Sequence, residues 1–233
     1  MERYRGPAQG VDTKSSPTDM VSEADRAAEA AIVEMLIAER PDDALLSEEG
    51  AGGAGTSGRR WVVDPLDGTT NYLYRFPSWA VSVALEDDEG ALAGVVHDPL
   101  TGETFRAERG GGAQLDGEPI HVNDLDRLDR ALVGTGFGYD PDVRRGQAEV
   151  LLAAIPHVRD IRRAGAAALD LCSVAAGRLD GYYERGLNHW DWAAGALIVR
   201  EAGGEVLPLE GGRPGLAAAG PRLVRALADL VRE

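Results

Sequence analysis

Two aspartates that stand three positions apart, Asp64 and Asp67, lie in the stretch WVVDPLDGTTN, residues 61–71. The apolar residues before them predict a buried strand, Pro65 is expected to end it, and Gly68 followed by two threonines predicts a turn into a helix. Both carboxylates are therefore expected on a tight loop at a strand end. Two like charges about 4 Å apart repel by roughly 4 kcal/mol at an effective dielectric constant near 20, so a converging pair holds a proton or binds a cation. Oxygen ligands favour a hard cation, Mg²⁺ before zinc or copper.

Further acids could complete such a site, although each also has a simpler interpretation. Glu48 follows a short strand pattern in SEEG, and Asp191 opens a helical pattern in HWDW. Glu48 could be a surface acid and Asp191 a helix N-cap, while Asp64 could cap a turn and Asp67 could be a solvated loop acid. The residue spacing alone leaves both interpretations open.

The elements that must position these acids can be predicted from hydrophobic periodicity. Apolar residues at helical spacing predict a helix over residues 22–40, which Pro41 ends. Short β-type runs with turn residues between them then predict an antiparallel sheet from strands at 44–46, 61–63, 80–85 and 92–97. The glycine-rich stretch 50–58 is expected to be a flexible loop.

The second half of the chain has a different pattern. Helices are predicted over residues 143–155, 166–176, 192–202 and 222–231. Strands are predicted near residues 158–161 and 181–183. This alternation indicates helices layered on a second sheet, with a division between lobes in the polar stretch 123–130.

Composition limits the classes of protein and partner. The 233 residues are 44% hydrophobic, enough for a substantial core, and the net charge of −15 disfavours a nucleic-acid or anionic membrane partner. Cys172 is the only cysteine, which excludes an internal disulfide and a thiolate zinc cluster. The polar start and the absence of a long apolar run lead us to expect a soluble cytoplasmic protein.

Three motifs in order, SEEG, DPLDGTTN and WDWAAGALIVREAGG, closely resemble those of the inositol monophosphatase family of metal-dependent phosphatases. The similarity runs from about Lys14, in TKSSPTDMVSEAD, through RRAGAAALDLCSVAAGRLDGYYE to about Gly204. The resemblance implies an α+β fold, a layered αβαβα sandwich of the type shared with fructose-1,6-bisphosphatase. We expect one catalytic unit over residues 1–233: a lobe 1–125 with the main metal motifs and a lobe 126–233 that contributes Asp191 and the substrate side.

The same resemblance implies roles for individual residues. Two or three Mg²⁺ ions would be held by four carboxylates and one backbone carbonyl, those of Glu48, Asp64, Asp67, Asp191 and Leu66. Gly68 and Thr69 would present backbone N–H groups to the phosphate, as a helix N-terminus does for anions. The implied catalytic residues are Thr69, Asp25 and Glu48, of which Thr69, paired with Asp25, would help deprotonate the attacking water. Asp25 also stands three residues after Ser22, and a capping box alone could explain it.

On the substrate side, Glu184 in YYERG would bind a hydroxyl group of the substrate. The backbone around Gly165, Ala166 and Ala167 would line the sugar or cyclitol. The implied substrate-binding set is Gly68, Thr69, Gly165, Ala166, Ala167, Glu184 and Asp191.

The resemblance implies Mg²⁺-dependent hydrolysis of a phosphate monoester, with myo-inositol monophosphate first among the substrates. Fructose 1,6-bisphosphate, 3'-phosphoadenosine 5'-phosphate and histidinol phosphate are alternatives, and a non-catalytic metal- or phosphate-binding relative is another. A homodimer and inhibition by lithium are also implied. The glycines of 50–55 match GxGxxG, but the strand at 61–63 follows too soon for a dinucleotide-binding helix.

Two departures from the family pattern concern the substrate and the subunit pairing. Only 13 residues precede Lys14, so the first helix is expected to be missing or shortened, and Ala166 stands where many relatives have Ser or Thr.

Overall fold

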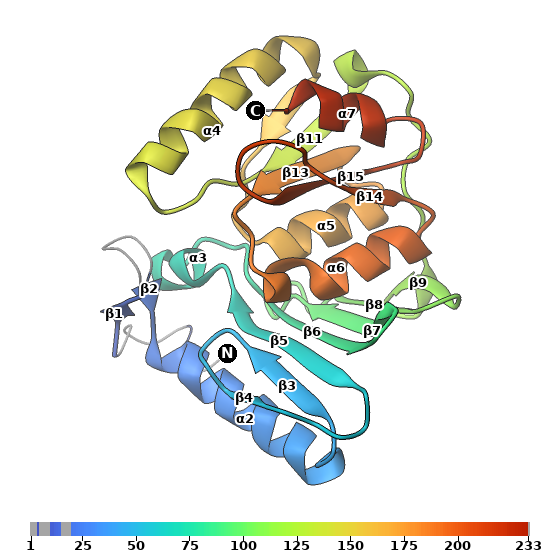
Figure 1. Ribbon diagram of the computed structural model, residues 1–233. Helices are drawn as coiled ribbons and strands as arrows, with labels where there is room; N and C mark the ends of the chain where they lie inside the picture. The colour runs from blue at the N-terminus through green and yellow to red at the C-terminus, as the bar shows by residue number, and fades with distance from the viewer. Residues whose placement is uncertain (1–3, 5–9, 15–19, 233) are drawn as a thin grey trace.

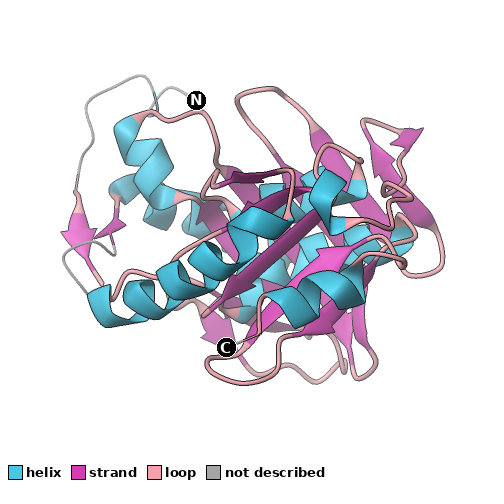
Figure 2. Cartoon of the chain, turned by 90° about the horizontal axis from the view of Figure 1, so that it is seen from above, coloured by secondary structure: helices cyan, strands magenta, loops and turns pink. Residues whose placement is uncertain are grey.

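The chain forms five layers in the computed structural model, which describes residue 4, residues 10–14 and residues 20–232 (Figure 1). Helix α2 (Glu23–Glu39) covers one face of an eight-stranded sheet, and α5 (Ala167–Ala175) and α6 (His189–Glu201) cover the other. A five-stranded sheet packs on the far side of α5 and α6, and α4 (Pro141–Ala154) and α7 (Val224–Leu230) form the outermost layer. Viewed from above, these outer helices lie in front of the strands (Figure 2). The predicted α+β layered fold is confirmed.

The eight-stranded sheet has the order β10-β9-β8-β7-β6-β5-β3-β4. Its strands are β3 (Ala44–Ser47), β4 (Gly52–Gly53), β5 (Arg60–Asp67), β6 (Ala80–Asp87), β7 (Gly90–His97), β8 (Thr104–Glu108), β9 (Gly112–Leu115) and β10 (Glu118–Pro119). All neighbouring pairs are antiparallel except β3 and β5, which are parallel. The prediction missed β8 to β10, and the loop expected at 50–58 contains β4, which pairs with β3.

The five-stranded sheet has the order β12-β11-β13-β15-β14. Its strands are β11 (Leu132–Thr135), β12 (Asp160–Arg162), β13 (Gly181–Arg185), β14 (Glu205–Pro208) and β15 (Gly215–Ala219). β11 pairs in parallel with β12 and β13, and the other pairs are antiparallel. The prediction found β12 and β13 but missed β11, β14 and β15. The division expected at 123–130 falls between β10 and β11, and the two lobes themselves stay a prediction.

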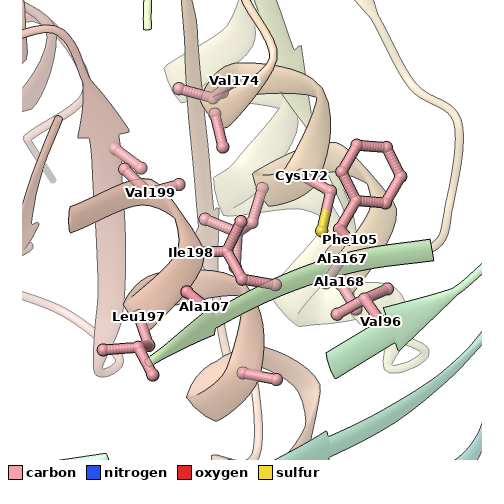
Figure 3. Packing of buried hydrophobic residues seen from close by; sticks show 14 of the residues in the cluster. Val96, Phe105, Ala107, Ala167, Ala168, Cys172, Val174, Leu197, Ile198 and Val199 are labelled. Atoms are coloured by element: carbon pink, nitrogen blue, oxygen red, sulfur yellow. The ribbon is translucent and has the colours of Figure 1, made fainter. Parts of the chain in front are cut away.

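The core lies where α5 and α6 meet the eight-stranded sheet (Figure 3). Side chains of Val96 and Phe105 from β7 and β8 point toward Cys172 of α5 and Ile198 of α6, and all four are almost fully buried. Gly94 allows the close approach of α6, because a Cβ there would stand 3.0 Å from the Cα of Ala194. The two helices are therefore fixed between the sheets, and their N-terminal ends are fixed with them.

Local signals account for the remaining elements. Ser22 caps α2 in a capping box with Asp25, and Asp140 caps α4, which has Pro141 in its first turn. Two short strands, β1 (Asp12–Thr13) and β2 (Met20–Val21), pair beside the six-residue helix α3 (Thr69–Tyr74). The expectation of a missing or shortened first helix falls mostly on residues 1–3 and 5–9, which, like residues 15–19 of the family-like segment, lie outside the described residues. No helix in the described ranges has the length and apolar character needed to cross a membrane.

Candidate active site

The two aspartates of the opening motif lie inside β5 and not after it. Pro65 does not end the strand: pairing with β6 continues to Asp67, with a shift of register between Asp64 and Asp67. A proline is tolerated at such a bulge because no ladder hydrogen bond is required of it there. The expectation of a loop at a strand end was therefore wrong.

Asp64, Asp67, Glu48 and Asp191 line one cavity of about 480 Å³. Glu48 follows β3, which pairs in parallel with β5, and its own N–H donates to the carbonyl of Val63 at 3.2 Å. Asp191 lies in the first turn of α6, which packs against β5 and β6. Three segments far apart in sequence thus bring their carboxylates to the same place.

Backbone N–H groups orient the three aspartates. Asp64 Oδ1 accepts from Leu66 N at 3.0 Å, and Asp67 Oδ2 accepts from Ala168 N at 2.8 Å. Asp191 Oδ2 accepts from Asn188 N at 2.6 Å in a capping box, so Asn188 and not Asp191 is the N-cap of α6. Each aspartate uses one oxygen for a hydrogen bond of the fold and keeps another oxygen for a ligand.

The electrostatics of these acids are unfavourable without a cation. Burial raises the pKa of Asp64 well above its usual value, and the charges of Glu48, Asp67 and Asp191 raise it further. Burial and then the charge of Asp191 likewise raise the pKa of Asp67. Burial raises the pKa of Asp191 to about 7, against the hydrogen bond from Asn188. The cluster therefore favours either bound protons or positive charge.

One cationic side chain already touches this cluster. Lys14 Nζ lies 2.7 Å from Glu48 Oε1 and 2.6 Å from Glu49 Oε1. Lys14 was not among the expected site residues, because a lysine in a polar segment is most simply a solvated loop charge, although relatives often have a lysine near the metal site. In the structure it neutralises part of the acid cluster.

The carboxylate oxygens that line the cavity suit Mg²⁺, although the side chains do not have the arrangement that they would have around a bound ion. No group of three or more His, Cys, Asp and Glu side chains within the described ranges has the arrangement of a metal site. Hard cations take oxygen ligands, and a buried, mutually repelling set of carboxylates offers them at high negative charge. The residues therefore fit magnesium in their chemistry.

Thr69 and Asp25 are hydrogen-bonded, as the resemblance implies. Thr69 Oγ1 lies 2.8 Å from Asp25 Oδ1 and 3.2 Å from the carbonyl oxygen of Leu66. Asp25 Oδ2 accepts from Ser22 N at 2.9 Å, so the same carboxylate also completes the capping box of α2. The two interpretations of Asp25 are compatible, because each uses a different oxygen.

Gly68 forms the turn that leads from the bulge into α3. Its φ is +92°, in the left-handed region that favours glycine, and a Cβ there would stand 3.0 Å from the carbonyl oxygen of Ser78. Gly68 and Thr69 both line the cavity beside the carboxylates.

The expected substrate side is brought to the same cavity, with one exception. Gly165, Ala167 and Glu184 line it, whereas Ala166 is fully buried at the N-cap of α5 and is not among the lining residues. Tyr182 Oη donates to Glu184 Oε2, and burial raises the pKa of the Glu184 carboxyl.

Sequence reasoning also missed residues that hold the loops of the cavity in place. Asn71 Nδ2 donates to the carbonyl oxygen of Ser78 at 2.7 Å and to that of Ala164 at 2.8 Å, which ties α3 to the loop before α5. Asp170, in α5, is 4% exposed, and burial followed by the charge of Glu184 raises its pKa to about 8. The only sequence signal for Asn71 was its place at the end of DPLDGTTN, and Asp170 had none.

Comparisons with known proteins identify relatives over nearly the whole chain. The model of the inositol monophosphatase family matches residues 1–231. Inositol-1-monophosphatase SuhB of Mycobacterium tuberculosis is 46% identical over 206 residues, which cover 84% of this chain and 71% of that protein. Nus factor SuhB of Vibrio cholerae is 40% identical over 228 residues, or 95% of this chain and 85% of that one.

A solved structure gives the same result for the fold. The crystal structure of the extragenic suppressor protein suhB from Bartonella henselae superposes with a TM-score of 0.90 at 41% identity, covering 96% of this chain and 88% of that one. The layered fold, the carboxylate-lined cavity and these relatives place the chain in the phosphatase class. More particularly, the chain belongs to the inositol monophosphatase family.

Proposed function

We propose that this protein hydrolyses phosphate monoesters with Mg²⁺ as its cofactor and that myo-inositol monophosphate is its first candidate substrate. One observation carries the proposal: four carboxylates from β5, α6 and the turn after β3 line one cavity together with Gly68 and Thr69. Hydrolysis of a phosphate ester needs such a site, because the anionic phosphate must be held by positive charge and N–H donors before water attacks it. The carboxylates would hold the cations, and the backbone of Gly68 and Thr69 would supply the N–H groups.

The ligands of two or three Mg²⁺ ions would be the carboxylates of Glu48, Asp64, Asp67 and Asp191 and the carbonyl of Leu66. When bound, the ions supply charge that lowers the pKa of water and stabilises the leaving alkoxide. The N–H groups of Gly68 and Thr69 would bind the phosphate oxygens.

Thr69 would position the attacking water. Because its hydroxyl donates to Asp25 Oδ1, the hydroxyl oxygen has lone pairs available to accept a hydrogen bond from water. The water loses a proton toward this Thr69–Asp25 pair as its oxygen bonds to phosphorus, the ester P–O bond breaks, and the departing alkoxide takes a proton from solvent water. No covalent phosphoenzyme is needed.

Glu184 and the loop at Gly165 would bind the organic part of the substrate. A partly buried carboxyl group beside backbone amide groups fits a polyhydroxy compound, which supports a cyclitol or sugar phosphate. Fructose 1,6-bisphosphate, 3'-phosphoadenosine 5'-phosphate and histidinol phosphate would be cleaved by the same chemistry.

Phosphate release from myo-inositol 1-phosphate tests the proposal. We expect turnover with Mg²⁺, none in EDTA, and inhibition by millimolar lithium. The variant Asp88→Asn, an exposed acid in the turn between β6 and β7, is a matched control and should behave as wild type. Turnover that does not depend on metal, or no release from about twenty phosphorylated metabolites, would contradict the proposal.

A second candidate function is that of a non-catalytic relative that binds a metal or phosphate. Lys14 on Glu48 and Glu49 favours it, because an internal cation already occupies part of the acid cluster. Calorimetry would then show Mg²⁺ binding by a protein that releases no phosphate from the same panel.

We also propose that the chain works in the cytoplasm as a homodimer, as the family resemblance implies. Light scattering would then give twice the chain mass of 24.7 kDa, and a monomer that keeps full activity would contradict the dimer.

A further inference from the structure

Four cationic side chains line the cavity, and two of them, Lys14 and Arg185, are hydrogen-bonded to groups of the protein itself. The four are Lys14, Arg163, Arg185 and Arg213. Lys14 is held by Glu48 and Glu49. Arg163 is exposed and has no hydrogen bond or ion pair with the described residues, but its charge opposes the rise in pKa that burial causes at Asp170 and Glu184.

Arg185 is held by the loop between β14 and β15. It is 5% exposed, and its guanidinium donates to three backbone carbonyl oxygens of the loop between β14 and β15. Nη1 lies 2.7 Å from the oxygens of Gly211 and Arg213, and Nη2 lies 2.9 Å from that of Glu210. This buried arginine fixes the loop that carries Arg213.

Arg213 differs from Lys14 and Arg185, and unlike Arg163 it has no recorded effect on a neighbouring acid in the described part of the chain. Its side chain is exposed, and its guanidinium makes no hydrogen bond or ion pair with the described residues. It lies against Gly186, where a Cβ would stand 3.7 Å from Nη1. Gly186 N donates to the carbonyl oxygen of Pro214 at 2.8 Å, which holds the two loops together at the cavity.

A second buried side chain joins the neighbouring loop to this framework. Gln147 of α4 accepts from Gly138 N at 2.9 Å and donates to the carbonyl oxygen of Arg185 at 3.2 Å. We call the cavity lining formed by residues 138–140, 186–188 and Arg213 the loop wall. Since Gln147 and Arg185 tie its segments together, Arg213 stands on a fixed support.

This placement suits recognition of a second anion. A guanidinium presents a planar fork of donors that matches phosphate or carboxylate, and a cation without a protein partner gains most from such a ligand. The loop wall belongs to elements other than β5 and the turn after β3, so an anion at Arg213 would not compete with the scissile phosphate for the carboxylate end.

We propose that Arg213 forms a second anion subsite and that the preferred substrate is a phosphate monoester whose organic part carries another negative group. That group is a phosphate or a carboxylate, held by the loop wall while the scissile phosphate lies beside Gly68 and Thr69. The inference rests on the proposed phosphatase function and changes the order of its candidate substrates: esters with a second anionic group, such as fructose 1,6-bisphosphate, come before myo-inositol monophosphate.

Three matched open-chain substrates test the subsite. Glucitol 6-phosphate is neutral at carbon 1, gluconate 6-phosphate carries a carboxylate there, and glucitol 1,6-bisphosphate carries a phosphate. We expect wild type to show a kcat/KM at least about fivefold higher for one or both of the charged substrates, mainly through KM, and we expect this preference to shrink at high salt. The larger gain identifies which anion is recognised.

Variants assign the preference to Arg213. Arg213→Gln should remove it, Arg213→Lys should restore part of it because charge is kept while the fork is lost, and Arg225→Gln, an exposed arginine of α7, should leave it unchanged. Equal kcat/KM for all three substrates in wild type, or an unchanged preference in Arg213→Gln, would overturn the subsite alone. Absence of hydrolysis of every substrate with Mg²⁺ would overturn the phosphatase function on which it rests.

Discussion

The two sides of the cavity are built by opposite means. On the carboxylate side, acids from β5, α6 and the turn after β3 are buried or partly buried and repel one another, and backbone N–H groups orient the three aspartates. On the loop wall, exposed loops from the second half of the chain are held by Gln147 and Arg185 over separations of 9 to 38 residues. The carboxylate side therefore holds like charges that repel one another, whereas the loop wall presents Arg213, which has no partner among the described residues.

The difference indicates that the two sides of the cavity have different roles. Strand pairing and helix caps are rigid, so they can hold like charges close together until a cation neutralises them. Loops tied by side chains can change in sequence without disturbing that arrangement. We therefore expect chemistry to depend on the carboxylate side and substrate choice on the loop wall, and four changes test this from the largest expected effect to the smallest.

Asp67→Asn should have the largest effect. It keeps the shape of the side chain but removes one charge from the carboxylate cluster, so turnover with Mg²⁺ should fall roughly a thousandfold. Because a repelling charge is lost, the melting temperature in EDTA should stay equal or rise. Near-wild-type turnover would show that Asp67 is not a ligand, and Asp88→Asn is the matched control.

Thr69→Val should lower kcat roughly a hundredfold, because it removes the hydroxyl that donates to Asp25. Thr69→Ser keeps that hydroxyl and should recover most of the rate. Thr70→Val is a neighbouring control, since the buried Thr70 hydroxyl has no hydrogen-bond partner among the described residues. If both valine variants lost the same activity, packing and not the hydroxyl would be responsible.

Asn71→Ala should lower both the stability and the activity of the protein. It removes two buried hydrogen bonds that join α3 to the loop before α5, and it leaves two carbonyl groups without that donor. We expect a loss of about 2 kcal/mol in the free energy of unfolding and a fall of about tenfold in kcat/KM. Urea denaturation and steady-state kinetics measure these effects.

Asn123→Ala provides the comparison, because this exposed amide also makes two hydrogen bonds but lies outside the cavity. A similar loss of kcat/KM in both variants would mean that the effect of Asn71 is one of general stability.

Asp170→Asn should affect activity least and the pH dependence of stability most. Burial raises the pKa of Asp170 from 3.8 to about 8, so the folded state holds a proton that the unfolded state has lost. Stability in EDTA should therefore fall as pH rises from about 4 to about 8, by at most about 1.4 kcal/mol per pH unit from this group.

The asparagine variant should have a shallower slope, which urea denaturation at pH 5.5 and pH 8 would detect. An unchanged slope would show that Asp170 is charged in the folded protein across this range.

Much of the carboxylate side could be predicted because its signals are local. DPLDGTTN, SEEG and HWDW each place an acid next to a strand or a helix start, and the capping box of Ser22 and Asp25 is visible at its spacing of three residues. The prediction failed at Pro65, because proline was taken to end a strand and the bulge that accommodates it is defined by pairing with β6. It also missed β8, β11 and β15, whose short apolar or mixed runs carry weak periodicity.

The sequence by itself determined the acids, the glycine turn, the principal helices and the family, because these depend on residue type, spacing and contacts with near neighbours. Only the tertiary structure decided that Glu48 and Asp191 meet the bulge of β5, that Lys14 lies on Glu48, and that Arg185 holds the loop of Arg213 at the cavity. The physical reason is distance along the chain: Glu48 is 16 positions from Asp64, Arg185 is 28 from Arg213, and Lys14 is 34 from Glu48. Burial and hydrogen bonding of the whole fold select them, and no local preference encodes them.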